Sequence, residues 1–480
     1  MDRLCELNAK NVFKYFYEIS RIPRGSGDME RISDYCMEFA KAHSLKAVRD
    51  SANNVIIYKD ATVGYEDSET VILQGHLDMV CQKTKESEID FTKDGLEVFL
   101  DGDFLKARGT TLGADNGIAV AMILAVLESN DISHPAIEAL FTTDEEIGMI
   151  GAAKFDAGML KGRRMINIDS EDEGVLTVSC AGGSEVEASI SIKRIKKYAK
   201  RIRISLKGLK GGHSGVEINS GRINADILSG RVLNYLNNKF EFDIISINGG
   251  DKGNAIPLCC EIELLISEPY EFLEAANEYF NTIKKEIKER EPEFLPIVEM
   301  IDEGEFNVMD EESKDKLIFV LLNAPNGICQ MSKEIEGLVE TSLNLGILKT
   351  EADKIKMNFT LRSNKQSALD ALEERLTAFF KYLNCTSHAF GHYPPWEFRE
   401  NSLLQALYKE VFKEKFGYDV KVCAIHAGLE CGILSAKLDN LDCISIGPQM
   451  YDVHTVDERL CVLSTENIFE VLINLLKRIK

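Results

Sequence analysis

The sequence lacks any stretch that would anchor the chain in a membrane. No run of about 18 or more apolar residues occurs among the 480 residues, and a transmembrane helix needs such a run. Residues 1–6 contain acidic side chains and no apolar core, so they do not resemble a secretory signal. We therefore expect a cytoplasmic protein without a membrane partner.

Paired cysteines and excess positive charge are also missing. The 12 cysteines include one adjacent pair, Cys259 and Cys260, but no CxxC motif, which argues for reduced thiols rather than a disulfide framework. The 56 Lys and Arg residues are outnumbered by 78 Asp and Glu residues, for a formal charge of −22. This balance disfavours nucleic acids and anionic membranes as partners and would attract cations, metal ions included.

No linker rich in Pro, Gly or Ser marks a domain boundary, yet the pattern of the chain changes near residues 186 and 395. Strands of alternating pattern are expected at 188–192 and 201–206, followed by a helix over 225–236. A similar order of strands and helix recurs later in the segment. We expect a catalytic α/β domain formed by residues 1–185 and 396–480, interrupted by an inserted α+β domain at 186–395.

A buried strand is predicted from Val71, and it ends in His76 with Asp78 two positions later. The side chains of residues i and i+2 on an extended chain point to the same side. His76 can ligate a metal, and Asp78 can orient the imidazole from behind. The alternative on this stretch alone is a strand-end histidine that is hydrogen-bonded to its neighbour.

Acidic or histidine side chains follow other predicted strands in the same way. They are Glu145 and Glu146 after 136–143, Asp169 after 165–168, and His454 after 441–446. Asp115 lies in a Gly-flanked turn before a predicted helix at 118–127, where it could instead be an N-cap. Because ligand sites of open α/β sheets lie at the carboxyl ends of the strands, we expect these side chains to form one site.

The residue types of this set favour a catalytic metal centre. Carboxylates and imidazoles without thiolates suit zinc, manganese or cobalt. Three acids and two histidines exceed the needs of one catalytic ion, and they suit two ions that share a bridging carboxylate and activate water for hydrolysis. We therefore expect two divalent metal ions, with zinc as the first choice.

These motifs resemble those of the co-catalytic zinc metallopeptidase family that includes aminoacylases and carnosinases. The matching motifs are His76-Leu77-Asp78, Gly113-Ala114-Asp115-Asn116, Asp144-Glu145-Glu146-Ile147-Gly148, Asp169 after a strand, and His454-Thr455. Their order and rough spacing match over the whole chain. Within the family, the bacterial aminoacyl-histidine dipeptidases are the most similar group, through residues 211–215, residues 426–432 and a large lid. The resemblance implies a mixed sheet flanked by helices, with residues 186–395 as the lid.

The resemblance also implies a role for each metal-site residue. Asp115 bridges both metals; His76 and Asp169 complete the first site; Glu146 and His454 complete the second; Glu145 is the general base; Asp78 orients His76. It further implies that a homodimer can form through the lid.

Four further residues are implied to bind substrate: His213 at the oxyanion, Arg362 at the terminal carboxylate, and Asn254 and Gly428 along the cleft. The alternatives are an ordinary loop histidine for His213 and a surface arginine for Arg362. His426 and Glu430 are candidates for contacting the ends of the substrate, although either could be structural.

The function implied by the resemblance is hydrolysis of unblocked dipeptides, with Xaa-His dipeptides such as carnosine as the named class. Two alternatives use the same chemistry, namely an N-acyl-amino-acid deacylase and a broad di- or tripeptidase. A third alternative is a binding protein that has kept the fold and lost catalysis. That alternative predicts a missing ligand or base, and none is missing from the motifs.

Overall fold

The computed structural model describes residues 9–480 and divides into two compact units. The first unit contains the described residues up to Cys180 together with Phe398–Ala424 and Leu429–Lys480, and the second contains Ala181–Glu397 and Ile425–Gly428. The short segment 425–428 thus belongs to the second unit, although the sequence assigns all of 396–480 to the catalytic domain. No helix within residues 9–480 is long and apolar enough to cross a membrane.

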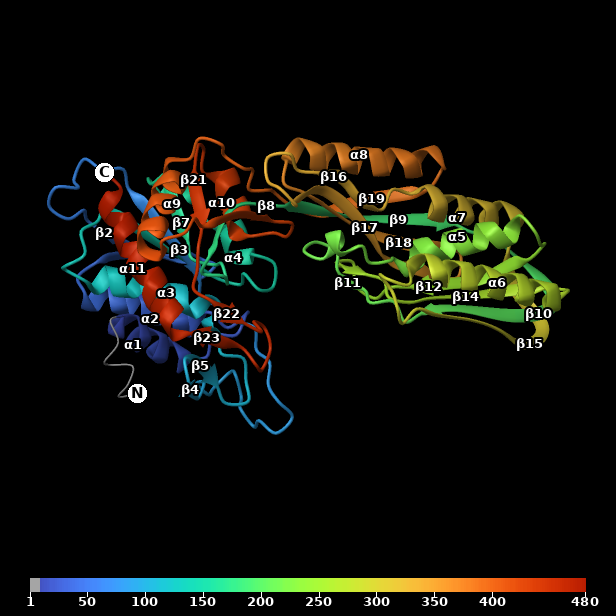
Figure 1. The fold of residues 1–480 in the computed structure, drawn as a ribbon, viewed down its shortest axis with the longest axis horizontal. Coiled ribbons are helices and arrows are strands. Elements are labelled where there is room, and N and C mark those ends of the chain that lie inside the picture. Colours follow the sequence, from blue (N-terminus) through green and yellow to red (C-terminus); the bar gives the residue numbers. More distant parts are fainter. Residues whose placement is uncertain (1–8) are drawn as a thin grey trace. The chain divides into compact units, whose positions relative to one another are not determined.

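The first unit is built on a mixed sheet in the strand order β1-β2-β6-β3-β7-β21-β8-β20 (Figure 1). The strands are β1 (Lys46–Arg49), β2 (Val55–Lys59), β3 (Val71–His76), β6 (Ile137–Thr142), β7 (Arg164–Asn167), β8 (Val175–Cys180), β20 (Lys421–Ile425) and β21 (Asp442–Ser445). The central strands β6, β3, β7 and β21 are parallel, whereas β1 pairs antiparallel with β2, β2 with β6, and β8 with β21. The carboxyl ends of four strands from distant parts of the chain therefore meet at one edge.

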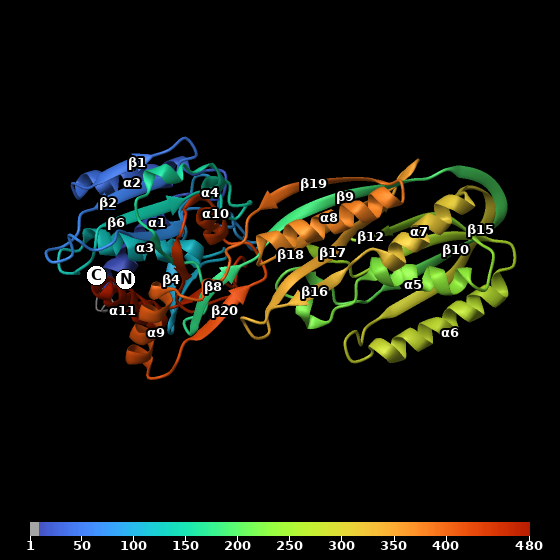
Figure 2. The same ribbon diagram turned by 90° about the horizontal axis from the view of Figure 1, so that it is seen from above.

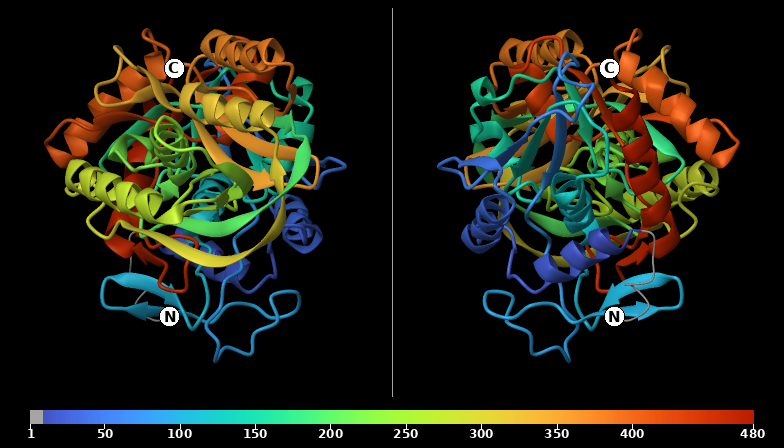
Figure 3. Two further views of the ribbon diagram at one scale, coloured as in Figure 1. Left: turned by 90° about the vertical axis from the view of Figure 1, so that its right-hand side faces the viewer. Right: turned by 90° about the vertical axis from the view of Figure 1, so that its left-hand side faces the viewer.

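Helices cover this sheet, and every residue of its strands β3 and β6 is therefore buried. The helices are α1 (Lys10–Ser20), α2 (Glu30–Ala42), α3 (Ala114–Glu128), α4 (Ile150–Lys154), α9 (Leu403–Phe416), α10 (Glu430–Lys437) and α11 (Val462–Arg478). Helix α3 packs against β3, and α9 packs against β21. Figure 3 (right) shows α1 and α2 in blue and α11 in red on the outside of the unit.

A small antiparallel sheet in the order β22-β23-β5-β4 lies beside the main sheet of the first unit. Its strands are β4 (Val98–Asp101), β5 (Phe104–Ala107), β22 (Met450–Tyr451) and β23 (Arg459–Cys461). The loop between β22 and β23 carries His454. Pairing of β23 with β5 ties this late loop to the segment that precedes α3.

The second unit is a nine-stranded antiparallel sheet in the order β15-β10-β14-β12-β17-β18-β9-β19, with β16 also paired to β17. Its strands are β9 (Gly182–Ser191), β10 (Arg194–Lys207), β12 (Asp243–Gly249), β14 (Cys260–Ile266), β15 (Leu295–Met309), β16 (Gly327–Met331), β17 (Val339–Thr350), β18 (Lys354–Ser363) and β19 (Thr386–Tyr393). A separate two-residue pairing joins β11 (Gly212–His213) to β13 (Ala255–Ile256).

Four helices lie on one side of this sheet (Figures 1 and 2): α5 (Ala225–Asn237), α6 (Pro269–Ile287), α7 (Glu311–Asn323) and α8 (Gln366–Tyr382). Strand β10 shows the resulting alternation, because Ile202 and Ile204 are fully buried. Arg201 and Arg203, which alternate with these isoleucines, form ion pairs with Glu263 on β14. The predicted fold class, a mixed α/β catalytic domain with an inserted α+β domain, is confirmed.

Candidate metal centre

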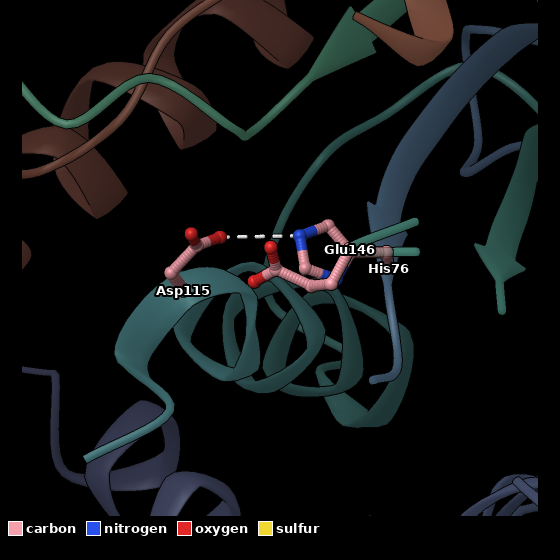
Figure 4. A group of neighbouring side chains, drawn as sticks. All are labelled: His76, Asp115 and Glu146. Atoms are coloured by element: carbon pink, nitrogen blue, oxygen red, sulfur yellow. Dashed lines mark hydrogen bonds and ion pairs between the residues drawn. The ribbon is translucent and has the colours of Figure 1, made fainter. Parts of the chain in front are cut away.

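Three side chains from three different elements of the first unit gather at the carboxyl edge of its sheet (Figure 4). His76 is the last residue of β3, Asp115 lies in the first turn of α3, and Glu146 follows β6. One donor atom from each lies within 4.8 Å of the others. This spacing is short enough for the three side chains to share metal ions.

Asp115 lies between two histidines that come from opposite ends of the chain. Its Oδ1 is 3.1 Å from His76 Nε2, and its Oδ2 is 3.0 Å from His454 Nε2. A second carboxylate lies near the same nitrogen of each histidine: Asp169 Oδ1 is 3.5 Å from His76 Nε2, and Glu146 Oε1 is 3.0 Å from His454 Nε2. The five residues therefore form two similar halves that share the carboxylate of Asp115.

The turn that carries Asp115 is not a simple helix cap. Gly113 is the residue before the helix, adopts a left-handed conformation (φ 63°), and has no side chain of its own to cap the helix. Asp115 itself departs from helical geometry (φ −78°, ψ 110°), and its peptide bond to Asn116 is cis. Its carboxylate meets the two histidines and not the backbone of α3, so the N-cap alternative does not describe this residue.

Crowding of buried acids shifts the pKa values in this region. Burial raises the pKa of Asp169 to about 6, although His76 acts against this shift. Burial also raises the pKa of Glu145 well above its usual value, and the nearby charges of Asp169 and Glu430 add to the shift. For Asp115, burial acts upwards, but hydrogen bonds with His454 and His76 outweigh it and lower the pKa. The acids outnumber the bases, so the cluster favours bound cations.

These five residues fit divalent metal ions by the chemistry of their donor atoms. All donors are imidazole nitrogens or carboxylate oxygens, the set that suits catalytic zinc, manganese or cobalt. Asp115 presents one oxygen to each half, as a bridging ligand must. His76 and Glu146 are nearly buried, with side-chain exposures of 1% and 6%, whereas His454 is 49% exposed.

Asp78 lies behind the ligands and is fully buried. Its Oδ1 is 3.3 Å from His76 Nδ1 and accepts a hydrogen bond from the backbone N–H of Glu145 at 3.0 Å. Its Oδ2 accepts from the N–H of Glu146 at 3.1 Å and from Ser26 Oγ at 2.8 Å. One carboxylate thus orients the ring of His76 and the backbone of the Glu145–Glu146 pair.

Sequence reasoning missed a polar network beneath the ligands. Gln74 Nε2 and Thr142 Oγ1 both donate to Glu430 Oε2 at 2.6 Å, and Asn167 Nδ2 donates to Gln74 Oε1 at 2.5 Å. Burial raises the pKa of Glu430 to about 7. Gln74 could have indicated this network from the sequence, because a polar residue in an otherwise apolar strand needs a buried hydrogen-bond partner. Glu430 lies inside the first unit, in contact with β3 and β6.

A second cluster of candidate residues lies within the second unit. Arg362 on β18 is only 6% exposed, so it is not a surface arginine, and its Nη1 donates to Tyr393 Oη at 3.0 Å. Its Nε has no hydrogen-bond partner among residues 9–480. His426 is buried beside it, with Nε2 2.7 Å from Ser342 Oγ and Nδ1 3.3 Å from Asn364 Oδ1.

His213 belongs to the same cluster. Its Nδ1 accepts from the backbone N–H groups of Gly215 at 3.1 Å and Val216 at 3.2 Å, so the ring proton is on Nε2. Burial lowers the pKa of His213, and the charge of Arg362 lowers it further. The same two causes lower the pKa of His426 to about 3. Both rings are therefore neutral at pH 7.

The other two predicted substrate contacts lie near these histidines. Asn254 is exposed, and its carbonyl oxygen accepts from Ser214 N at 2.9 Å, next to the pairing of His213 with Ala255. Gly428 lies two residues after His426, in the turn that precedes α10. All four predicted substrate-binding residues are thus in the second unit, and all five predicted metal ligands are in the first.

A model of peptidase family M20/M25/M40 matches residues 72–479. A cytosol non-specific dipeptidase of Escherichia coli (strain K12) is 34% identical over 483 residues, which cover 100% of this chain and 99% of the relative. The crystal structure of aminoacylhistidine dipeptidase from Vibrio alginolyticus is 35% identical and matches with a TM-score of 0.91, covering 99% of this chain and 98% of that one. An aminopeptidase structure from Bacillus cereus is 13% identical with a TM-score of 0.58 over 98% and 99% of the two chains, a likeness of fold alone.

Proposed function

The chain belongs to peptidase family M20/M25/M40, and on that premise we propose that it is a metal-dependent dipeptidase that hydrolyses unblocked dipeptides. Two dipeptidases similar to it over their full length, at 34% and 35% identity, support the reaction class. The observation that carries the proposal is the position of Asp115, whose two oxygens lie 3.1 Å and 3.0 Å from His76 and His454.

The residues around Asp115 would hold two divalent cations, with zinc preferred and manganese or cobalt as alternatives. Asp115 would be shared by both ions, His76 and Asp169 would complete one site, and Glu146 and His454 would complete the other. Such a pair, when bound, acidifies a water molecule and polarises the carbonyl group of the peptide bond. Asp78 keeps His76 in the tautomer that has Nε2 free for a ligand, because its carboxylate lies beside Nδ1.

Glu145 is the general base of the proposed reaction. It takes a proton from the attacking water and later passes that proton to the leaving amine. Its pKa is raised, first by burial and then by neighbouring acids. A base with a pKa nearer to neutrality can both accept and return the proton, so this shift suits the role.

We assign the second unit to holding the substrate. Arg362 binds the terminal carboxylate, because its Nε has no hydrogen-bond partner among residues 9–480 and can donate to a carboxylate oxygen. His213 donates its Nε2 proton to the carbonyl oxygen as negative charge develops there. Asn254 and Gly428 line the path of the dipeptide backbone. A clamp for a free carboxylate limits the enzyme to short substrates with an unblocked C-terminus.

Among dipeptides we propose that Xaa-His substrates, carnosine included, are accepted. The names of the two relatives differ on this point, since one is called non-specific and the other is called an aminoacylhistidine enzyme. A cytoplasmic location is proposed from the name of the Escherichia coli relative. A homodimer through the second unit stays a prediction, and light scattering of the purified protein measures it directly.

The test is a substrate panel assayed with wild type and Glu145→Gln, each with its metal content determined by elemental analysis. The panel contains Xaa-His and other dipeptides, a tripeptide and an N-acyl amino acid. We expect wild type to cleave dipeptides, and the variant to keep about two ions while losing at least ~10²-fold in rate. Cleavage of N-acyl amino acids only would replace the substrate class, and an absence of metal from wild type would overturn the proposal.

A further inference from the structure

Glu458 is a buried carboxylate that takes no part in the proposed reaction. It follows the His454 loop, directly before β23, and is only 2% exposed. Its Oε2 accepts from the backbone N–H groups of Leu112 at 2.8 Å and Gly113 at 3.0 Å. Its Oε1 accepts from those of Ala114 at 2.8 Å and Asp115 at 3.4 Å. A single side chain thus binds four consecutive amides of the turn that carries the bridging aspartate.

This carboxylate joins two segments that each deliver a metal ligand. Glu458 is four residues after His454, and it binds the turn of Asp115, which is more than 300 positions away in the sequence. The distance of 3.0 Å between His454 Nε2 and Asp115 Oδ2 depends on how the loop sits on that turn. His454 is half exposed and lacks the packing that holds His76 in place, so the contacts of Glu458 set its position.

Arg24 holds the same turn from its carbonyl side. This arginine is 2% exposed, and its Nη1 donates to the carbonyl oxygens of Leu77 at 3.0 Å and Asp78 at 3.1 Å. Its Nη2 donates to the carbonyl oxygen of Gly113. A Cβ on Gly113 would lie 2.5 Å from Nη2, so the turn is shaped around the guanidinium. Arg24 therefore ties the turn to the segment that follows His76.

We propose that Glu458 is a positioning residue of the metal centre. Its carboxylate binds the His454 loop to the Asp115 turn, so that one carboxylate faces both histidines. Arg24 is its partner. The carboxylate of Glu458 binds the backbone N–H groups of the turn, and the guanidinium of Arg24 binds a carbonyl oxygen of the same turn. This inference rests on the proposed function, since a positioning role needs metal ions to position. It extends the proposed function by one statement: Glu458 determines where His454 lies relative to Asp115.

The test compares Glu458→Gln with a matched control, Glu138→Gln. Glu138 is also a buried glutamate of the first unit, 3% exposed, and it accepts from the backbone N–H groups of Lys161 and Gly162 away from the ligands. In each variant one carboxylate oxygen becomes an amide NH₂ that cannot accept a hydrogen bond. The two variants therefore lose similar backbone contacts, and only one of them borders the metal centre.

The readouts are cobalt affinity, measured by competition with a chelator, and the visible absorption of the bound cobalt. In Glu458→Gln we expect one of the two ions to bind ~10–100-fold more weakly and the cobalt spectrum to change, while Glu138→Gln keeps both wild-type values. Glu458→Asp keeps the charge, and we expect it to bind cobalt with an affinity between those of wild type and Glu458→Gln. If Glu458→Gln does not fold, Glu458→Asp is compared with Glu138→Asp in the same assays.

Wild-type cobalt affinity and spectrum in the Glu458 variants would overturn the positioning role and leave the proposed function intact. Equal losses in the Glu458 and Glu138 variants would also overturn it, because they would reveal a general loss of stability. A wild-type protein that binds no cobalt, zinc or manganese would overturn the proposed function, and the inference would fall with it.

Discussion

Three acids of the first unit and two histidines of the second have pKa values that shift in opposite senses. In the first unit, burial and neighbouring acids raise the pKa values of Glu145, Asp169 and Glu430. In the second unit, burial and the charge of Arg362 lower the pKa values of His213 and His426. Each shift favours the neutral form of the group, because charge is costly away from water.

The difference lies in the charge that each cluster lacks. The acids of the first unit crowd round two histidines, so the cluster is completed by cations. The second cluster contains a buried arginine and two neutral histidines, so it is completed by an anion. In the proposed reaction, the carboxylate of a dipeptide would pair with the second cluster, and its hydrolysis would use metal ions held by the first. Four experiments would break or sharpen this contrast.

The largest effect is expected for removal of the shared ligand. Asp115→Ala deprives both histidines of their common carboxylate, so we expect loss of bound metal and at least a ~10³-fold loss of kcat/KM, because metal ions supply several kcal/mol of stabilisation. Elemental analysis and dipeptide hydrolysis measure the two losses together. Glu138→Gln is the control, and a variant that keeps two ions per chain would contradict the bridging assignment.

A smaller effect is expected when the cation of the second cluster is removed. Arg362→Met should lower kcat/KM for dipeptides by ~10²-fold, because truncating one partner of a buried charge pair costs about 2–5 kcal/mol, while the metal content stays at its wild-type value. The sharper measurement compares a dipeptide with its C-terminal amide. Wild type should prefer the free acid, and the variant should lose that preference.

Arg201→Met is the matched control for that experiment. Arg201 is also in the second unit but pairs with Asp302 and Glu263 on the open face of the sheet. Loss of these partly exposed ion pairs should change kcat/KM little. Equal losses in both variants would mean that Arg362 acts only on the stability of the unit.

Stability at low pH should expose the buried histidine of the second unit. The pKa of His426 is lowered from 6.5 to about 3 in the folded protein. Between these two pH values the unfolded chain binds a proton at His426 and the folded protein does not. The contribution of this residue therefore disappears as pH falls below 6.5, by up to about 5 kcal/mol at pH 3. His426→Gln cannot be protonated and should remove this part of the acid sensitivity.

The lone tryptophan makes this measurement specific to one unit. Trp396 is buried in the second unit, so its fluorescence during urea unfolding reports on that unit. The free energies of unfolding of wild type and variant should converge near pH 7 and diverge towards pH 4. Parallel curves over this range would show that His426 is not the group responsible.

A smaller effect on stability than that of His426, and of opposite sign, is expected in the first unit. The pKa of Glu430 is raised from 4.5 to about 7, so the folded protein holds a proton that the unfolded chain has released. The stability contributed by this group is full below pH 4.5 and falls by up to about 3 kcal/mol as pH rises to 7. In the presence of a chelator, Glu430→Gln should gain stability over wild type above pH 7, as measured by circular dichroism. An advantage that grows towards acid pH would contradict this assignment.

Much of the first unit follows from local patterns. The apolar run from Val71 predicts β3, and β3 ends at His76 as that run indicates. The helix expected at 118–127 is present as α3, which begins four residues earlier because the turn of Asp115 joins it. These features are local, since the pattern of apolar residues in a short stretch of sequence predicts buried strands and helices.

Other features were invisible because they depend on partners far away in the sequence. Only the family resemblance singled out Arg362, which otherwise resembles any strand-end arginine until the packing of β18 buries it. Gln74 and Glu430 are 356 positions apart, and no periodic pattern connects them. The hydrogen bonds of Glu458 to the Asp115 turn span a similar distance. Hydrogen bonds of this kind are chosen by the order of strands in a sheet, which a single sequence does not display.

The sequence alone therefore determined which residue types stand at the exits of the strands, and with them the chemistry of a centre built from carboxylates and imidazoles. The tertiary structure decided how these exits meet. Parallel pairing of β3 with β6 and β7, and of β7 with β21, brings segments from residues 71 to 445 to one edge. Burial at that edge then removes water from the charged groups, and this desolvation raises the pKa values of the acids and makes the contacts of Arg24 and Glu458 necessary.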